Sequence, residues 1–184
     1  MRLFAAVLPP AQAVAELREA VRALPADDRL RWTAEAGWHF TLAFMGEVHE
    51  EVLPDLHERL RRAAARTAPF ALRLHSCGHF GDRALWTGAA GELDALRMLA
   101  ERADAAARRA GVPMEQHRRY TPHLTLARSS HAVDLAPYLE ALRPFEGTRW
   151  QVGELSLVCS NLPTSGIPGE RPRYEVVAAW PLKG

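Results

Sequence analysis

The chain has 184 residues, of which 48% are hydrophobic and 24% charged, and its formal net charge is +1. This length is enough for one well-cored domain or for two small lobes that share a core. The near-neutral balance argues against a protein that wraps long nucleic acid by bulk electrostatics, but it leaves room for a local phosphate site.

The first half of the chain alternates between strand and helix patterns. A buried strand over Leu3–Leu8 stops at two prolines, and the apolar spacing after them predicts a helix over Ala11–Leu24. Further strands are expected over 30–32, 38–44, 70–74 and 84–87, and further helices over 50–66 and 92–110. The residues His75–His79, between two of these strands, are typical of a turn.

The second half restarts this pattern after Gly111 and Pro113, which end the long helix. Its expected elements are a strand over His123–Ala127, a short helix over Leu135–Leu142, and strands over Val152–Cys159 and Tyr174–Trp180. A Gly/Pro-rich loop over Asn161–Pro172 precedes the last strand. Because no polar linker divides the chain, we expect one α+β domain over residues 1–184, built as two lobes.

Two cysteines, Cys77 and Cys159, form neither a CxxC pair nor a disulfide framework, which fits a reducing compartment. The N-terminal apolar run is shorter than the core of a signal peptide, and no stretch approaches a membrane span. We therefore expect a cytoplasmic protein without membrane contact, and a monomer. Lys183 is the only lysine; arginine suits phosphate recognition, although a composition bias of the genome gives the same excess.

One five-residue string, His-Φ-Thr-Leu-Ala with Φ apolar, occurs twice in the chain, as His39–Ala43 and as His123–Ala127. The copies start 84 residues apart, on strands in corresponding places of the two halves. A single His-x-Thr on a strand most often marks an ordinary surface pair. Two copies in the same frame are much harder to obtain by accident, so the repeat points to a site that uses both.

Side chains at i and i+2 of a strand point to the same face, so each copy has a polar and an apolar face. The polar faces carry His39, Thr41 and Ala43 in the first copy, and His123, Thr125 and Ala127 in the second. The apolar faces carry Phe40, Leu42 and Phe44 in the first copy, and Leu124 and Leu126 in the second. On this alternation the two alanines leave free space beside the imidazole and the hydroxyl.

An approximate two-fold axis between the halves would turn both polar faces into one groove. Two imidazoles, each with an ordinary pKa of about 6.5, can hold opposite protonation states near neutral pH, one as base and one as acid. Two threonine hydroxyls can donate hydrogen bonds to the oxygens of a phosphoryl group. This set suits acid–base cleavage of a phosphodiester without a metal.

At these motifs the sequence resembles the 2H phosphoesterase superfamily, named for its two His-x-Thr-x motifs. Within it the sequence is similar to the RNA 2′,3′-cyclic phosphodiesterase family, also called 2′-5′ RNA ligase-like or LigT-like. The resemblance is carried by MRLFAA at 1–6, LRW at 30–32, HFTLAFMGEV at 39–48, PHLTLAR at 122–128 and PRYEV at 172–176. It covers essentially the full chain, in the family's order.

The resemblance implies two pseudo-symmetric lobes, with antiparallel sheets lining a central cleft and helices on the outside. It implies hydrolysis of RNA 2′,3′-cyclic phosphodiester ends to a 2′-phosphomonoester, with no cofactor and no metal. His39 would be the proton donor to the leaving ribose oxygen, and His123 the proton acceptor from the attacking water. The substrate-binding residues would be Thr41, Thr125, Arg128 and Phe4. From the sequence alone, the acid and base labels are exchangeable.

Two positions complicate this assignment. Strict alternation places Arg128 on the apolar side of its strand, so it reaches a phosphate only if the strand ends or bulges near Ala127. Tyr120 stands where the family often has Phe, and it adds a hydroxyl.

Other polar clusters support weaker hypotheses. His75, Cys77 and His79 could be taken for a metal cluster, but their spacing matches no usual zinc pattern. The stretch His117–His131 holds arginines and no acidic residue, which is compatible with a positive rim for an RNA end and equally with an ordinary charged surface. Arg171 and Arg173 would add to such a rim.

Two alternative functions remain open on the sequence. One is a phosphodiesterase for other cyclic or 2′-5′-linked nucleotides, and the other is a non-catalytic module that binds nucleotides or RNA ends. Because neither a Walker A loop nor a dinucleotide fingerprint is present, nucleotide-driven ligation has no visible machinery. The expected partners are RNA 2′,3′-cyclic phosphate ends or cyclic nucleotides.

Overall fold

The structure, a computed structural model, describes residues 1–116, 119–162 and 171–184. His117 and Arg118 of the predicted rim lie outside the described residues, as does most of the predicted loop Asn161–Pro172.

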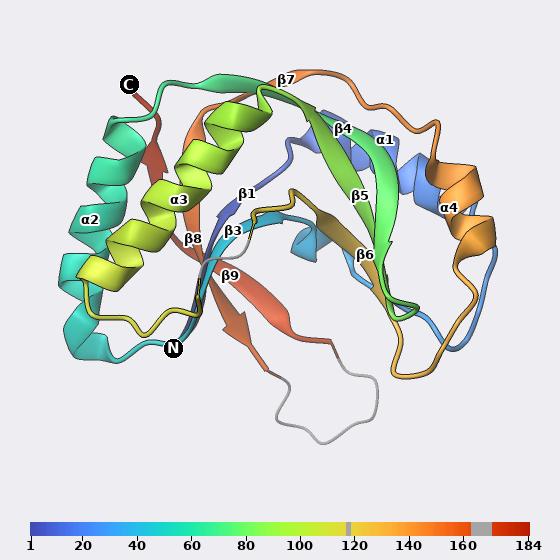
Figure 1. Cartoon of the computed structure of the whole chain (residues 1–184), viewed down its shortest axis with the longest axis horizontal. Coiled ribbons are helices and arrows are strands. Elements are labelled where there is room, and N and C mark those ends of the chain that lie inside the picture. The colour runs from blue at the N-terminus through green and yellow to red at the C-terminus, as the bar shows by residue number, and fades with distance from the viewer. Residues whose placement is uncertain (117–118, 163–170) are drawn as a thin grey trace.

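Two antiparallel sheets form the centre of the molecule (Figure 1). In the first sheet the strand order is β3-β1-β8-β9, with bounds Phe40–Glu47, Arg2–Val7, Glu154–Asn161 and Arg173–Pro181. In the second sheet the order is β2-β6-β5-β4-β7, with bounds Arg31–Trp32, Leu124–Arg128, Ala84–Gly91, Phe70–Phe80 and Trp150–Val152. The two predicted motif strands are β3 and β6, and they lie in different sheets, as the prediction of two lobes requires.

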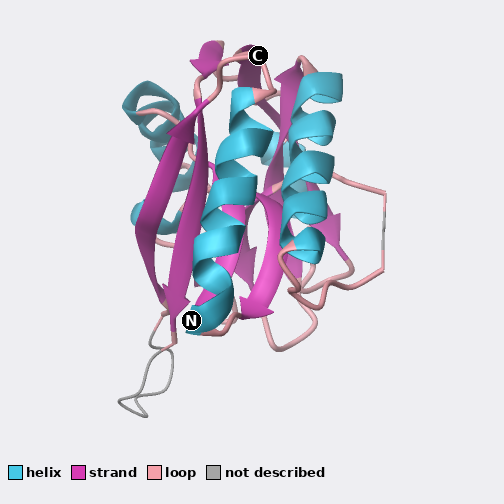
Figure 2. Cartoon of the chain, turned by 90° about the vertical axis from the view of Figure 1, so that its left-hand side faces the viewer, coloured by secondary structure: helices cyan, strands magenta, loops and turns pink. Residues whose placement is uncertain are grey.

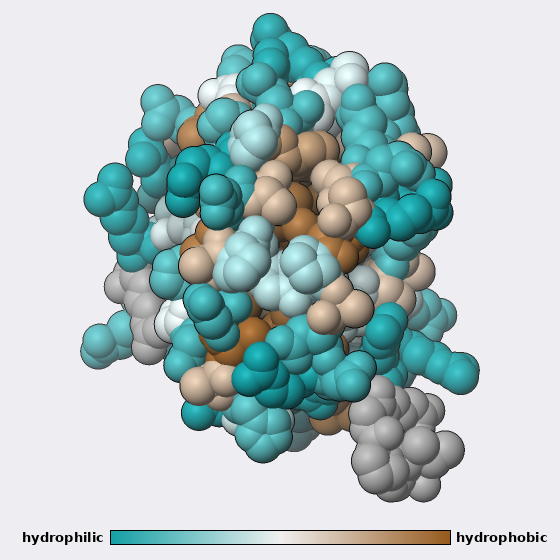
Figure 3. Space-filling view, turned by 90° about the vertical axis from the view of Figure 1, so that its right-hand side faces the viewer, coloured by the Kyte–Doolittle hydropathy of each residue, from teal (hydrophilic) through white to brown (hydrophobic). Residues whose placement is uncertain are grey.

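Four helices cover the outside of the described sheets: α1 (Ala11–Arg22), α2 (Leu53–Ala65), α3 (Leu93–Arg109) and α4 (Ala136–Leu142). α2 and α3 lie side by side over the first sheet, where α3 packs on β3 (Figure 2). α1 and α4 lie beyond the second sheet (Figure 1), and the surface on that side is mostly hydrophilic around a hydrophobic centre (Figure 3). The α+β class with antiparallel sheets inside and helices outside is therefore confirmed.

The chain crosses between the two lobes several times. α1 follows β1 of the first sheet, yet it lies beside the second, where Glu16 accepts hydrogen bonds from the backbone and hydroxyl of Thr148. α3 follows β5 of the second sheet and packs on the first. β7 and β8 belong to different sheets and are separated by Gly153 alone. The single strand predicted over Val152–Cys159 is therefore wrong: the chain leaves one sheet at Val152 and enters the other at Glu154.

The turn predicted at His75–His79 is also wrong, because β4 runs through it to Phe80. The register with β5 slips between His75 and Cys77, and Ser76 has a positive φ of 56°. Ser76 keeps its backbone bonds by other routes: its N–H donates to Phe145, and its carbonyl accepts from the Thr87 hydroxyl. A β-bulge therefore absorbs the turn-like residues and the strand continues.

Candidate active site

His39 and His123 each lie directly before a motif strand, and both rings are held in the same way. Nδ1 of His39 lies 2.7 Å from the carbonyl oxygen of Gly37, and Nδ1 of His123 lies 2.8 Å from that of Thr121. A carbonyl oxygen only accepts hydrogen bonds, so Nδ1 carries a proton in both rings. Nε2 is then the nitrogen of each histidine that is available to exchange a proton.

Both motif strands bulge at the same place in the motif. In the pairing of β1 with β3, Ala5 faces Ala43 and Ala6 faces Thr41, so Leu42 has no partner. In the pairing of β5 with β6, Leu85 faces Ala127 and Trp86 faces Thr125, so Leu126 is skipped in turn. A bulge of one residue reverses the facing of the side chains that follow it.

These bulges correct the alternation expected from the sequence. Ala43 and Ala127, expected beside the histidines, are buried in the core, with 6% and 0% of their surface exposed. Phe44, expected on the apolar face, is 62% exposed and lines the cleft. Arg128 lines the same cleft, so the condition set for it, a bulge near Ala127, is met.

A cleft of about 180 Å³ brings the predicted residues of both halves together. All six of the predicted site residues line it: Phe4, His39, Thr41, His123, Thr125 and Arg128. Residues that the sequence reasoning did not select also line it, among them Phe44, Tyr174, Thr33 and Gly37. The cleft therefore joins two imidazoles, two hydroxyls near them, one guanidinium and an aromatic wall.

His39 is the more enclosed of the two histidines. Its Nε2 lies 2.9 Å from Oγ1 of Thr41, and its ring lies against that of Phe4, with ring centres 4.5 Å apart. Burial lowers the pKa of His39 below its ordinary value; the hydrogen bond to Gly37 opposes this shift, and the charges of His123 and Arg128 add to it. In the neutral ring Nε2 accepts the hydrogen bond from the Thr41 hydroxyl.

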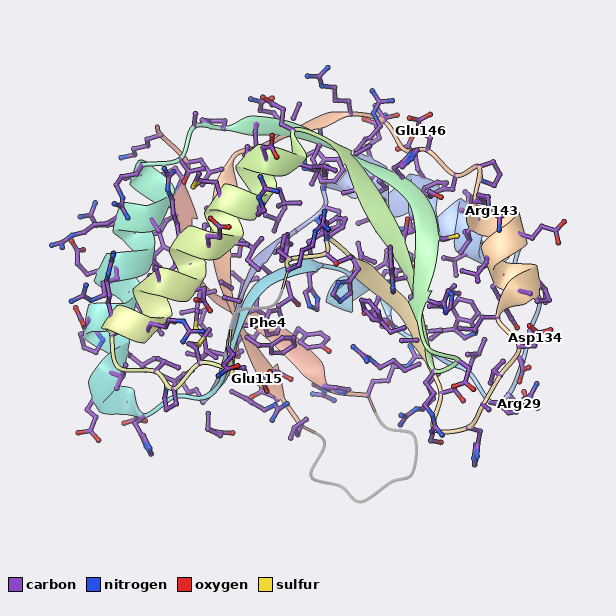
Figure 4. All side chains as sticks on the ribbon, viewed as in Figure 1. Phe4, Arg29, Glu115, Asp134, Arg143 and Glu146 are labelled. Atoms are coloured by element: carbon purple, nitrogen blue, oxygen red, sulfur yellow. The ribbon has the colours of Figure 1, made fainter. Side chains whose placement is uncertain are left out.

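Phe4 lies near the middle of the molecule, between the lobes (Figure 4), and only 2% of it is exposed. A side chain so buried supports the imidazole beside it and offers little surface to a ligand. The exposed aromatic surface comes from Phe44 and from Tyr174, whose rings each lie 5.7 Å from that of Phe4. Tyr174 packs on Gly37, where an added Cβ would come within 2.8 Å of its ring.

His123 has its own aromatic neighbours on the second lobe. The Phe80 ring meets it edge-on at 4.8 Å, and the Trp86 ring lies 6.0 Å away. The indole of Trp86 packs on Gly78 of the neighbouring strand β4, where an added Cβ would come within 2.3 Å of it. Each histidine is thus supported by aromatic rings from other strands of the same sheet.

Tyr120 connects the approach to the second motif with the first motif. Its hydroxyl donates to the backbone carbonyl of Thr41 at 3.0 Å, and burial raises the pKa of the phenol well above its ordinary value. The hydroxyl noted in the sequence therefore has a defined partner.

The sequence contains one signal that Phe44 lines the cleft. Phe44 follows the first motif directly, as Arg128 follows the second. Tyr174, Phe80 and Trp86 carry no such signal: they come from strands whose pairing is not visible in the sequence.

The other histidine cluster considered in the sequence lies outside the cleft. His75, Cys77 and His79 lie along β4, where Cys77 donates to the carbonyl of Leu139 and Nδ1 of His79 donates to that of Gly81. Among the described residues, no three side chains of ligand type gather as a metal site would require. No helix of the described residues has the length and apolar character needed to cross a membrane.

Two sheets that bring paired His-x-Thr strands to one cleft define the class of 2H phosphoesterases. A model of the 2′-5′ RNA ligase superfamily matches residues 6–161, and the chain belongs to this superfamily.

Its relatives include several RNA 2′,3′-cyclic phosphodiesterases. The one from Thermus thermophilus is 32% identical over 205 residues, which cover all of this chain and 91% of the relative. The one from Geobacillus stearothermophilus is 35% identical over 83% of this chain, which spans about half, 48%, of that relative's length. Among solved structures, E. coli LigT complexed with 3′-AMP matches with a TM-score of 0.82 and 29% identity, over 100% of this chain and 98% of that one.

Proposed function

We propose that this protein hydrolyses the 2′,3′-cyclic phosphodiester at RNA ends to a 2′-phosphomonoester, by acid–base catalysis with two histidines and without a metal. One observation carries the proposal: Nδ1 of both His39 and His123 is anchored to the backbone, while both rings line one cleft. The names of the relatives supply the substrate class.

The proposed reaction needs one proton accepted and one donated. Nε2 of His123 accepts a proton from water, whose oxygen attacks phosphorus. As the new P–O bond forms, the bond from phosphorus to the ribose 3′ oxygen breaks, and Nε2 of the protonated His39 gives its proton to that oxygen. The phosphate then stays on the 2′ oxygen, and the two histidines exchange protons with solvent to restore their starting states.

The other cleft residues stabilise the charge that grows on the phosphoryl oxygens. Arg128 offers a guanidinium to the two non-bridging oxygens, and the hydroxyls of Thr41 and Thr125 can donate further hydrogen bonds to the same oxygens. Thr41 couples these tasks: its hydroxyl donates to Nε2 while His39 is neutral, and it is released for phosphate once His39 is protonated.

The lowered pKa of His39 has a consequence for the acid role. In the free protein the neutral ring is favoured more than for an exposed histidine. An anionic phosphate in the cleft offsets the charge of Arg128 and favours the protonated ring. Substrate binding therefore favours the protonated state of His39 that the proposed donor role requires.

Two substitutions test the proposed roles. General acid–base catalysis typically contributes about 10²–10⁴-fold, so His39→Ala and His123→Ala should each lower turnover of a nucleoside 2′,3′-cyclic phosphate in excess EDTA by that factor. His49→Ala, at an exposed histidine outside the cleft, is the control and should keep wild-type turnover. Near-wild-type rates in either cleft variant would contradict the proposal.

The alternatives give other outcomes in the same assay. Binding without turnover would favour a non-catalytic module, and loss of turnover in EDTA would contradict the metal-independent mechanism. Turnover of other cyclic or 2′-5′-linked nucleotides alone would favour that class of substrate. Phosphorus NMR of the product distinguishes a 2′-phosphate from a 3′-phosphate. The cytoplasmic location and the monomeric state stay predictions, and light scattering during size-exclusion chromatography tests the second.

A further inference from the structure

A second, larger groove opens directly beside the cleft. Its volume is about 680 Å³, against about 180 Å³ for the cleft, so it offers far more room than the cleft itself. The two spaces share part of their walls: Thr33, Gly37, Arg128, Pro172 and Tyr174. A molecule held in the cleft can therefore continue into this groove past Arg128 and Tyr174.

The groove is basic. Four of its described lining residues are arginines: Arg31, Arg128, Arg171 and Arg173. No acidic residue of the described chain lines it. Glu35, which lies between the lining residues Ala34 and Ala36, is engaged by Arg18, with Nε 2.5 Å from the carboxylate.

Most arginines elsewhere in the described chain have acidic partners, whereas these four have none among the described residues. Ion pairs are formed by Arg18, Arg22, Arg29, Arg59, Arg61, Arg62, Arg73, Arg83, Arg97 and Arg108. Arg29, at the outer edge of the lobe that carries α4 (Figure 4), pairs with Asp27 at 2.7 Å. Two residues further on, Arg31 lines the groove without such a pair among the described residues.

The pairing of β2 with β6 places two of these arginines opposite each other, and their repulsion destabilises the free protein. Arg31 is the register partner of Arg128, so two like charges stand directly opposite each other on neighbouring strands. Such pairs destabilise a sheet, and no described carboxylate lies between them to offset the repulsion. An anion placed between the two guanidinium groups would relieve it.

Aromatic side chains complete the groove. Trp32 and Tyr174 line it together with the arginines. Grooves that bind single-stranded nucleic acid combine the same two features, positive charge along the backbone and aromatic rings on which bases stack. A cyclic phosphate occupies the 3′ end of its strand, so the rest of an RNA in the cleft must leave from the 5′ side of the last nucleotide.

We propose that this groove binds the RNA strand upstream of the cyclic phosphate, with Arg31 and Arg173 holding internucleotide phosphates, so that an oligonucleotide is turned over more efficiently than a mononucleotide. This inference rests on the proposed function, which it extends from the reacting phosphate to the strand that carries it. Arg128 faces both spaces and lies at the junction.

The test compares two substrates that end in the same cyclic nucleotide: a trinucleotide and a mononucleotide. Wild-type kcat/KM should be higher for the trinucleotide. Arg31→Gln and Arg173→Gln should each lower the ratio of trinucleotide to mononucleotide kcat/KM by about 10- to 100-fold, the usual effect of losing one charge-assisted hydrogen bond. Arg109→Gln, an exposed arginine on α3 outside the groove, is the matched control and should leave the ratio unchanged.

A binding measurement separates this inference from the proposed function. Fluorescence anisotropy with a labelled trinucleotide should show a log–log salt slope that becomes shallower by about 0.7 for each arginine removed, the value for one phosphate contact in a single strand. Failure of the wild type to turn over either substrate would overturn the proposed function alone. Equal kcat/KM for both substrates, or a salt slope and ratio unchanged in both variants, would overturn the groove.

Discussion

At the scale of single residues, His39 and His123 hold the same position in two copies of one motif but have different surroundings in space. Both rings are fixed through Nδ1, which orients Nε2. His39 in addition is held by Thr41 and packed against Phe4, and its burial lowers its pKa. Two groups whose environments differ in this way can hold different protonation states, which acid–base catalysis with one donor and one acceptor requires.

The lowered pKa of His39 gives a prediction about stability. Above about pH 6.5 the ring is neutral in both the folded and the unfolded chain, and it contributes no pH dependence. Below this pH the unfolded chain binds a proton that the folded ring still resists, so folding stability falls with pH until His39 itself is protonated. In urea titrations between about pH 7 and pH 5, the wild type should lose more unfolding free energy than His39→Gln.

His49→Gln removes an exposed histidine in the same way and is the control for this measurement. It should follow the wild type across the pH range. If His39→Gln also followed the wild type, burial would not be lowering the pKa of His39.

At the scale of elements, the bulged motif strands show what the sequence could and could not predict. The repeated motif predicts that the two motif strands meet at one cleft, and all six selected residues, of which Phe4 and Arg128 come from the family resemblance, line it. The facing of Ala43, Phe44 and Ala127 was not predictable, because one unpaired residue reverses it and pairing depends on strands distant in sequence. The same dependence on partners hid the bulge at Ser76 and the change of sheet at Gly153.

Because of the bulge at Leu42, a charge introduced at Ala43 should destabilise the fold much more than a charge introduced at Phe44. Ala43→Asp would bury a carboxylate at a site that is 6% exposed, and it should lower the unfolding free energy by about 2 kcal/mol or more. Phe44→Asp changes a side chain that is 62% exposed and should cost about 0.5–1 kcal/mol at most. Urea unfolding of both variants measures the difference. Strict alternation, without the bulge, predicts the reverse order of stabilities.

At the scale of the whole molecule, the chain passes repeatedly from one lobe to the other, and each lobe is covered by a helix that follows a strand of the other lobe. α1 and α3 each pack with the lobe that does not hold the strand before them. Gly153 joins a strand of one sheet to a strand of the other, and Tyr120, ahead of β6, donates to the backbone of β3. A site made of one histidine from each lobe needs such a connection, because its geometry is only as fixed as the lobes are relative to each other.

The interleaved path predicts that residues 1–184 unfold as one cooperative unit, as expected for a single domain. Loss of either lobe would remove the packing of a helix that the chain contributes to the other, so no half-folded state should accumulate. Thermal unfolding followed by far-ultraviolet circular dichroism and by tryptophan fluorescence should give coincident transitions, and the calorimetric enthalpy should equal the van't Hoff enthalpy. Two separated transitions, or a calorimetric enthalpy well above the van't Hoff value, would mean that the lobes fold independently and that the cleft lies between two domains.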